Sequence, residues 1–361
     1  MKKWSVFLSV LCFLIGATSY PIWKEKIDVL LREPITKENT ITSIEQLEQR
    51  VRQNLEEGKT EETLYIKGVE KEELASINTN LDGYYGYVDS YYLAKWPIKG
   101  MYKIRLKYQL SDNYYAYHYI TEGLDISEHE SAKVLADKAK QILDTIIKDG
   151  MSDYEKEQAI HDYIIKNGQY DFLTGEKEED SYHAKGILLE GKGVCSSYSE
   201  SMQLLLSLAG VESKIVIGKA DVEHSWNLVN INGAWYHVDA TWDDPVPDEK
   251  GRVLYNYFNV PDELMKKTHT WKTQYYEAAT SYDENYYARR GDLCKTYEEA
   301  KQRILEGLKK KETKISLLLT GKNAKDYSYN FVLQNENVAN IQWKHLGESP
   351  CLVMEMTVTY Q

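Results

Sequence analysis

The sequence predicts an α+β fold, in which helices come first and antiparallel strands follow. Apolar residues recur at helical spacing over about 128–149 and 152–167. Strand-like runs separated by turn signals then extend from 214 to 240. Helices followed by strands are typical of an α+β domain rather than a doubly wound sheet. The chain has 361 residues, 42% hydrophobic and 28% charged, enough for two or three domains with buried cores.

The first 23 residues have the pattern of a targeting segment. Lys2 and Lys3 precede an apolar run from 4 to 17, and small residues follow up to Ser19. A basic start, an apolar middle and small residues at a cleavage site are typical of an export signal. The apolar stretch continues to Trp23, so it is nearly long enough to remain as a membrane anchor. In both cases we expect an extracellular or cell-surface protein that meets the membrane only through this segment.

The charge balance argues against a nucleic-acid partner. The formal net charge is −12, and no basic stripe stands out that could neutralise phosphates. The sequence contains no heptad seam or dimerisation motif, so it does not predict an oligomeric state.

An internal repeat brackets the middle of the chain. Residues 43–68 align without gaps to residues 296–321, an offset of 253. Each copy begins with a helix N-cap residue, continues with an amphipathic helical pattern and ends in a short strand before a glycine. The likeness extends to the final strands, which end at Gln109 and Gln361. We therefore expect two small helix-plus-sheet modules flanking a central domain, with the limits 41–122, 128–275 and 290–361.

Cys195 has the setting of a reactive thiol. It follows two glycines, Gly191 and Gly193, and opens an apolar-periodic run that ends at Gly210. This places Cys195 in the first turn of a buried helix, where the positive end of the helix dipole favours the thiolate. Its own N–H is a natural oxyanion donor, and the glycines leave room for a substrate. Taken alone, the residue favours a structural cysteine on a core helix over a reactive one.

A hairpin turn fixes the register of the two strands that follow. Asn232-Gly233 separates the runs HSWNLVNI and AWYHVDA. Asn-Gly between such runs predicts a two-residue turn, which pairs Ile231 with Ala234. Because side chains alternate between the two faces of a sheet, a turn longer by one residue would send them to the opposite face.

This register brings a histidine and a carboxylate together. Asp239 falls opposite Trp226, so His224 and Asp239 become diagonal neighbours on one face. A carboxylate beside an imidazole can orient it as a base. His237 lies on the same face and is a competing base, but it pairs opposite Leu228, further into the hairpin. We therefore expect His224 to be the base and Asp239 the orienting acid.

No metal or other cofactor is expected. Cysteine and histidine both occur, but without the CxxC or HxxxH spacing of zinc sites. Cys12 lies in the targeting segment, which leaves an odd number of cysteines in the exported body. A bridge between Cys294 and Cys351 would leave Cys195 as the unpaired thiol; two reduced, buried cysteines are the alternative.

Three segments resemble the transglutaminase-like superfamily in its bacterial exported branch: GKGVCSSYSESMQLLLSLAGVESKIVIG, HSWNLVNINGAWYHVDATWDDP and YNYFNVPDELM. The resemblance runs from about 132 to 269 and is weak or absent in the flanking modules. It implies a papain-like α+β core with the cysteine at a helix N-terminus and the histidine and aspartate on adjacent antiparallel strands. Carried over to this chain, it implies Cys195 as nucleophile, His224 as base and Asp239 as the orienting acid.

Four further residues are candidates for the substrate cleft or the oxyanion site. Trp226 matches the family's usual aromatic residue and is expected to shield the ion pair. Tyr182 and Tyr198 flank the cysteine in sequence and are candidates for the cleft wall or the second oxyanion donor, with buried packing as the alternative. Gly193 is the fourth. For His161, on a predicted helix, we expect a packing role rather than a catalytic one.

Three functions fit these residues. The first is an exported cysteine peptidase or amidase that forms an acyl-enzyme on peptide, protein or cell-wall peptide substrates. The second is a protein-crosslinking transglutaminase, in which a lysine amine replaces water. The third is a non-catalytic binding or scaffold protein at the cell surface. Retention of all three catalytic residue types favours an enzyme.

Overall fold

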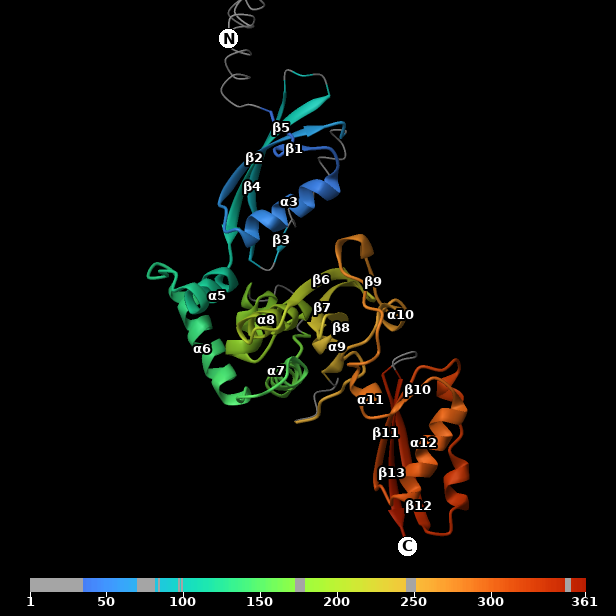
Figure 1. Cartoon of the computed structure of the whole chain (residues 1–361). Helices are drawn as coiled ribbons and strands as arrows, with labels where there is room; N and C mark the ends of the chain where they lie inside the picture. Colours follow the sequence, from blue (N-terminus) through green and yellow to red (C-terminus); the bar gives the residue numbers. More distant parts are fainter. Residues whose placement is uncertain are drawn as a thin grey trace, which may run out of the picture. The chain divides into compact units, whose positions relative to one another are not determined.

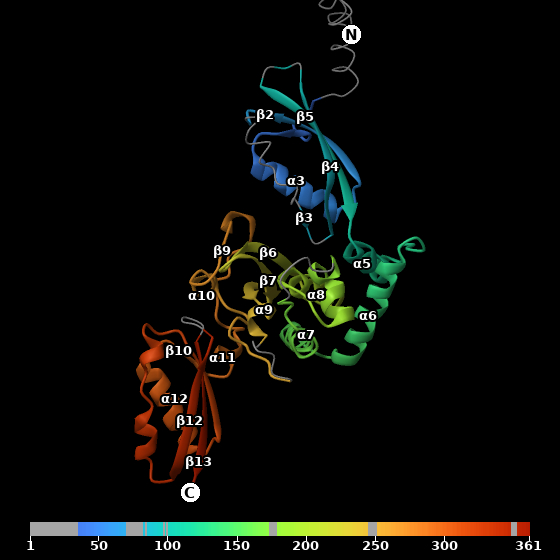
Figure 2. The ribbon, with the colours of Figure 1, turned by 180° about the vertical axis from the view of Figure 1, so that it is seen from behind.

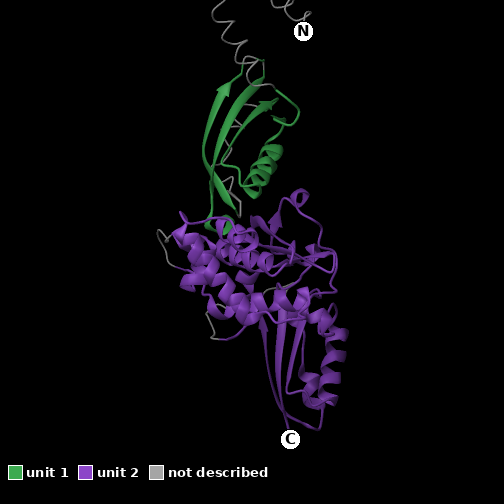
Figure 3. Ribbon diagram, turned by 60° about the vertical axis from the view of Figure 1, so that its left-hand side comes forward, with its two compact units in different colours: residues 1–114 green, residues 115–361 purple. Residues whose placement is uncertain are grey.

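The computed structural model describes residues 35–69, 82–83, 85–96, 98, 100–172, 179–244, 251–347 and 352–361. The predicted targeting segment lies outside the described residues. The chain divides into two compact units, residues 1–114 and 115–361, coloured separately in Figure 3. Within the described part of the chain, no helix is long and apolar enough to cross a membrane.

The first unit is a helix packed on a five-stranded sheet. The helix α3 (Ile44–Glu56) is capped by the Ser43 side chain, which accepts from the backbone N–H of Gln46. It buries its apolar stripe, Leu47, Val51 and Leu55, as its helical period predicts. The strand order is β1-β2-β5-β4-β3. The strands are β1 (Thr40–Ile41), β2 (Glu61–Lys67), β3 (Asp82–Gly83), β4 (Gly86–Lys95) and β5 (Met101–Leu110).

The C-terminal module has the same plan, as the sequence repeat predicts. Its sheet order is β10-β11-β13-β12, and its first pair is parallel, as is β1 with β2. The helix α12 (Tyr297–Lys309) begins with a capping box of Thr296 and Glu299, and it lies along one face of this sheet in Figures 1 and 2. The strands are β10 (Leu293–Cys294), β11 (Lys314–Leu319), β12 (Val338–Leu346) and β13 (Leu352–Tyr360).

Finer features also recur between the two modules. A bulge interrupts the pairing of β4 with β5 between Val88 and Ser90, and another interrupts that of β12 with β13 between Val338 and Asn340. The module limits given above remain predictions, since the division of the chain into two units falls at 114/115. Cys294 is a free, buried thiol, which favours the reduced alternative for this cysteine; Cys351 lies outside the described residues.

Helices precede the strands in the central region, as predicted. The two helical segments predicted from periodicity are confirmed as α6 (Glu130–Ile146) and α7 (Asp153–Asn167). A capping box of Ser152 and Glu155 begins α7. The remaining helical elements before the sheet are α5 (Asp112–Glu122), η1 (Glu179–Tyr182), η2 (Gly186–Glu190) and α8 (Cys195–Leu208).

A four-stranded antiparallel sheet packs against α8 (Figure 1). Its order is β8-β7-β6-β9, with β6 (Ser213–Lys219), β7 (Glu223–Ile231), β8 (Ala234–Val238) and β9 (Thr270–Trp271). In the second unit, Leu318 and Val353 of the C-terminal module share one apolar cluster with Val216 and Trp226 of this sheet. The other short elements are α9 (Ala240–Asp243), α10 (Asp262–Met265), η3 (Thr273–Tyr275), α11 (Tyr286–Arg289), η4 (Ala324–Asp326) and η5 (Asn330–Gln334).

The predicted hairpin register is confirmed. Ile231 pairs with Ala234, and both turn residues, Asn232 and Gly233, have left-handed backbone angles (φ 55° and 82°). Two consecutive positive φ values are the mark of the tight turn that Asn-Gly predicts. One detail differs from the prediction: the β7–β8 ladder ends at Val238. Asp239 leaves the strand to cap α9, because its side chain accepts from two backbone N–H groups there.

Candidate active site

Cys195 is the first residue of α8, as predicted, and its side chain is partly exposed. The helix ends in a Schellman motif: Val211 N–H donates to Leu206 C=O at 2.9 Å and Gly210 N–H to Ser207 C=O at 3.1 Å. A thiol at a helix N-terminus lies where unpaired N–H groups and the helix dipole stabilise negative charge. The position therefore combines access to solvent with a bias toward the thiolate.

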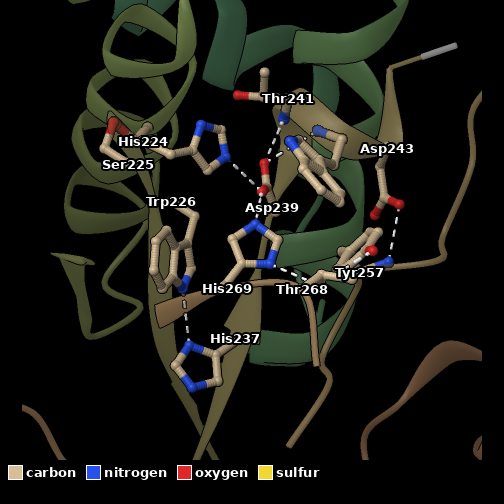
Figure 4. Close-up of polar contacts among 12 residues, drawn as sticks. His224, Ser225, Trp226, His237, Asp239, Thr241, Asp243, Tyr257, Thr268 and His269 are labelled. Atoms are coloured by element: carbon tan, nitrogen blue, oxygen red, sulfur yellow. Dashed lines mark hydrogen bonds and ion pairs between the residues drawn. The ribbon is translucent and has the colours of Figure 1, made fainter. Parts of the chain in front are cut away.

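The structure brings together the three residues that the sequence singles out. His224, on β7, donates from Nε2 to Asp239 Oδ2 at 2.7 Å, as Figure 4 shows. Hydrogen bonding with His224 is among the causes that lower the pKa of the Cys195 thiol, and Nδ1 is the ring nitrogen that Asp239 does not occupy. The histidine is 7% exposed and the aspartate 0%. The arrangement is compatible with a thiol whose neighbouring imidazole is held by a buried carboxylate.

Electrostatics favours an ion pair between Cys195 and His224. Burial alone would raise the pKa of the Cys195 thiol, but the hydrogen bond and charge of His224 outweigh it and hold this pKa below its ordinary value. Burial would likewise lower the pKa of His224, but Asp239, together with Cys195, raises it to about 10. With the thiol pKa lowered and the imidazole pKa raised, the thiolate–imidazolium form is favoured over the neutral pair.

Ser225 is a residue that the sequence reasoning missed. Hydrogen bonding from its backbone and its hydroxyl is, after that of His224, among the causes that lower the pKa of the Cys195 thiol. The hydroxyl also lies 2.9 Å from that of Ser199 on α8. Ser225 therefore links β7 to the helix that carries the nucleophile. Its place directly after His224 is the only sequence signal for it.

Asp239 is held by four donors. His224 and His269 both donate to Oδ2, at 2.7 and 3.1 Å, and the backbone N–H groups of Thr241 and Trp242 donate to Oδ1, at 3.0 and 3.1 Å. Burial alone would raise the pKa of Asp239, but His224 and His269 hold it well below its usual range. The carboxylate stays charged and fixed in direction, as a base-orienting group must.

The competing histidine has another role. His237 Nδ1 accepts from Trp226 Nε1–H at 2.9 Å, and its Nε2 lies 2.9 Å from Asp262 Oδ1. Both ring nitrogens of His237 therefore have partners other than Asp239. The Trp226 ring stacks at 5.9 Å from the His224 ring, in line with a shielding role. Because Trp226 is 1% exposed and its indole N–H is occupied, it offers neither a cleft wall nor an oxyanion donor.

Two of the other cleft candidates, Tyr198 and Gly193, have their hydrogen-bonding groups occupied by other parts of the protein. Tyr198 is fully buried, and its hydroxyl donates to Asp244, so the packing alternative holds for it. Gly193 N–H donates to Gln169 C=O at 3.1 Å. A Cβ at Gly193 would lie 2.5 Å from Ser197 Cβ, so the glycine admits a packed side chain rather than a substrate. Tyr182, 44% exposed, remains a candidate for the cleft.

A tyrosine that the sequence reasoning did not single out lies beside the nucleophile segment. Tyr170 forms an isolated bridge with Gly193, two residues before Cys195. Burial raises the pKa of its hydroxyl, and the negative charge of Cys195 raises it further. Its ring contacts that of Phe172, which is largely exposed, with 4.8 Å between centroids. Tyr170 thus lies within electrostatic reach of the thiol, and Phe172 packs on its ring.

His224, Asp239 and His269 are the described residues whose side chains have the type and spacing of metal ligands, with their donor atoms within 4.8 Å of one another. Both imidazoles direct Nε2 at the same oxygen of Asp239, at hydrogen-bonding distance. In this arrangement both histidines are hydrogen-bond partners of the carboxylate, so we interpret the cluster as a hydrogen-bonded group rather than a metal site.

A second buried histidine–aspartate pair supports the site from α7. His161 Nε2 lies 3.2 Å from Asp243 Oδ2, and Asp243 Oδ1 accepts from Tyr257 N–H at 2.9 Å. Both side chains are fully buried. Asp243 follows Asp239 by one helical turn, and its N–H donates to Asp239 C=O at 3.0 Å. These contacts agree with the packing role expected of His161.

The substitution His161→Leu should destabilise the fold by about 3–5 kcal/mol, because it leaves the Asp243 carboxylate buried without its cation. Burial alone would lower the pKa of His161, but Asp162 and Asp243 raise it to about 9. The contribution of the His161 charge is therefore lost as the pH rises through about 9, while burial raises the pKa of Asp243 to about 6 in spite of His161, so the ion pair is present between these two values. Urea unfolding at pH 7.5 and pH 9.5 measures both effects. Adding Asp243→Asn should recover part of the loss; no recovery would contradict the pairing.

Comparison with known proteins agrees with this geometry. Residues 140–240 match the family model of the transglutaminase-like superfamily, which supports a core of that superfamily in this part of the chain. Kyphoscoliosis peptidase of Homo sapiens is 28% identical over 159 residues, covering 38% of this chain and 24% of the relative. The Mus musculus protein is 27% identical over 135 residues, covering 33% and 20%. The chain thus matches about a quarter or less of the length of these relatives.

Solved structures with similar folds include one titled as a TGase, with 14% identity and a TM-score of 0.29, covering 57% of this chain and 59% of that one. Another is a putative cysteine protease from Cytophaga hutchinsonii, with 16% identity and a TM-score of 0.26, covering 52% and 74%. At these TM-scores the likenesses carry no argument of their own. The superfamily assignment, taken with the site, supports a thiol enzyme.

Proposed function

We propose that the protein is an exported cysteine peptidase or amidase that cleaves amide bonds through an acyl-enzyme, with Cys195 as nucleophile, His224 as base and Asp239 as the orienting acid. The observation that carries this proposal is the buried hydrogen bond of 2.7 Å between His224 and Asp239, together with a thiol at the N-terminus of α8 whose pKa His224 lowers. A structural cysteine needs neither a lowered pKa nor a histidine held by a buried carboxylate.

The chemistry proceeds in two halves. The Cys195 thiolate attacks the carbonyl carbon of an amide, and the negative oxygen that forms is stabilised by N–H groups at the start of α8. His224, as imidazolium, gives its proton to the leaving amine, and the C–N bond breaks to leave a thioester on Cys195. Water then attacks the thioester, His224 takes its proton, and the carboxylic acid leaves as the thiolate re-forms.

Peptide or cell-wall peptide is the proposed substrate class. The residue pattern of the first 23 residues supports export, which would place the site among cell-surface peptides and wall crosslinks. The kyphoscoliosis peptidases, which match part of the central domain, are named as peptidases. The partly exposed aromatic side chains of Phe172 and Tyr182 could supply apolar contacts for an extended chain.

The test is a product analysis with two acceptors. The full chain is incubated with casein-derived peptides and, separately, with crosslinked wall muropeptides, each in the presence and absence of a dansylated primary amine. New termini detected by mass spectrometry without amine incorporation are expected. Incorporation of the amine in place of water would identify crosslinking instead. If neither product forms and the Cys195 thiol reacts only as an ordinary cysteine, the protein is a binding protein. Cys195→Ala is the control for both assays.

A further inference from the structure

His269 shares the carboxylate that holds the base. Its Nε2 lies 3.1 Å from Asp239 Oδ2, the same oxygen that His224 Nε2 reaches at 2.7 Å (Figure 4). His269 follows Asp239 by 30 residues and approaches from the segment between α10 and β9. It is fully buried, so it does not meet a substrate directly.

A chain of hydroxyl groups fixes this second imidazole. Thr268 Oγ1 lies 2.8 Å from His269 Nδ1, and the Tyr257 hydroxyl donates to Thr268 Oγ1 at 3.4 Å. When the Thr268 hydroxyl donates to Nδ1, the proton of His269 is on Nε2, facing Asp239. The ring also lies against those of Trp226 and Trp242, with centroids 4.9 and 4.6 Å away. Its position and its tautomer are both set by the surrounding groups.

We propose that His269 is a positioning residue that acts on the Cys195–His224 pair through Asp239. This inference rests on the proposed function. Both histidines donate a hydrogen bond to the same oxygen of Asp239. The bond from His269 therefore weakens the stabilisation that this carboxylate gives to the His224 imidazolium. His224 is then held in place but still able to release its proton.

The consequence concerns the acid step of the reaction. His224 must give its proton to the leaving amine, and its pKa is already raised to about 10. A carboxylate bound only to His224 would raise this pKa further and weaken His224 as an acid. His269 limits that effect. In the free enzyme, its loss should widen the pH range in which thiolate and imidazolium coexist.

The experiment compares two substitutions in the full chain. In His269→Gln, the side-chain N–H₂ group can replace Nε2–H, whereas His269→Leu keeps an apolar volume and loses the donor. The rate of Cys195 alkylation by iodoacetamide is measured from pH 4 to pH 11, with the adduct located by mass spectrometry. The plot of rate against pH has an acid limb, set by the Cys195 thiol, and an alkaline limb, set by His224. For His269→Leu we expect the acid limb to move to lower pH and the alkaline limb to higher pH, each by about half a pH unit. His269→Gln should keep both limbs near those of the wild type.

Thr268 offers an independent variant that leaves His269 in place. Thr268→Val removes the hydroxyl that sets the tautomer, so it should shift both limbs in the same directions but less than His269→Leu. Thr268→Ser keeps the hydroxyl and should restore the wild-type limbs. Urea unfolding of each variant records the loss of packing separately.

The outcomes separate this inference from the proposed function. Limbs that stay in place in His269→Leu and Thr268→Val, while stability falls, would mean that His269 only fills space, and the positioning role would be wrong. Limbs that shift equally in His269→Gln and His269→Leu would also overturn it, because the donor would not matter. A wild-type thiol that titrates as an ordinary cysteine would overturn the proposed function, and the positioning role with it.

Discussion

Replacing Cys195 with alanine is expected to abolish amide-bond cleavage while the free energy of unfolding changes by less than about 1 kcal/mol. Activity depends on the thiolate, which alanine lacks. Stability changes little because the side chain is only partly buried and its loss removes a charge that burial penalises. Product release from peptides and urea unfolding measure the two effects on the same preparation.

Cys294→Ala provides the matched control. Cys294 is a buried free thiol in the apolar core of the C-terminal module, and burial raises its pKa to about 12. Its substitution should cost about 1 kcal/mol of stability and leave cleavage unchanged. If Cys195→Ala instead unfolded the protein, or if its cleavage rate matched that of the wild type, the nucleophile assignment would be wrong.

Asp239→Asn should lower the cleavage rate by about a thousandfold or more and also destabilise the fold by about 3 kcal/mol. The amide cannot stabilise the His224 imidazolium, and its N–H₂ group meets at least one of the four donors that now converge on the carboxylate. In the wild type, ionised Asp239 contributes to the free energy of unfolding because its pKa is lower in the folded state. This contribution is present above about pH 4 and is lost as the pH falls further.

Asp262→Asn is the control for Asp239→Asn, because Asp262, like Asp239, pairs with a histidine. Its partner is His237 on β8, at 2.9 Å. It lies outside the Cys195–His224 chain, so we expect cleavage to fall by less than about tenfold. Rates at saturating and limiting substrate, with urea unfolding at pH 7 and at about pH 2.5, separate chemistry from stability. Equal losses of activity in the two variants would mean that general destabilisation, rather than the orientation of His224, explains the effect.

Local signals in the sequence were sufficient for much of the site. Two turn residues, Asn232 and Gly233, determine the β7–β8 register, and the register places His224 near Asp239. The run from Cys195 to Gly210 predicts a helix with the thiol in its first turn, because its apolar spacing and its stop signal both lie within that stretch. The repeated modules follow from their N-caps and matched spacing.

Other features depend on contacts between distant segments. His269 meets Asp239 only because α10 and β9 return the chain to the sheet, and no pairing rule links residues 30 apart across an irregular loop. Tyr198 was a cleft candidate from its position in sequence, but its helical phase turns it inward, to Asp244. The exit of Asp239 from its strand was also missed, because a capping side chain competes with the ladder at that point.

The most direct test of the central claim is the pH dependence of Cys195 alkylation by iodoacetamide in the folded protein, with His224→Ala measured beside it. The lowered thiol pKa and the His224 pKa of about 10 predict that labelling stays rapid to a lower pH than for an ordinary thiol. In His224→Ala, rapid labelling should appear only near the ordinary thiol pKa of about 8.5. Labelling that follows the same curve in both proteins would contradict an activated pair at this site.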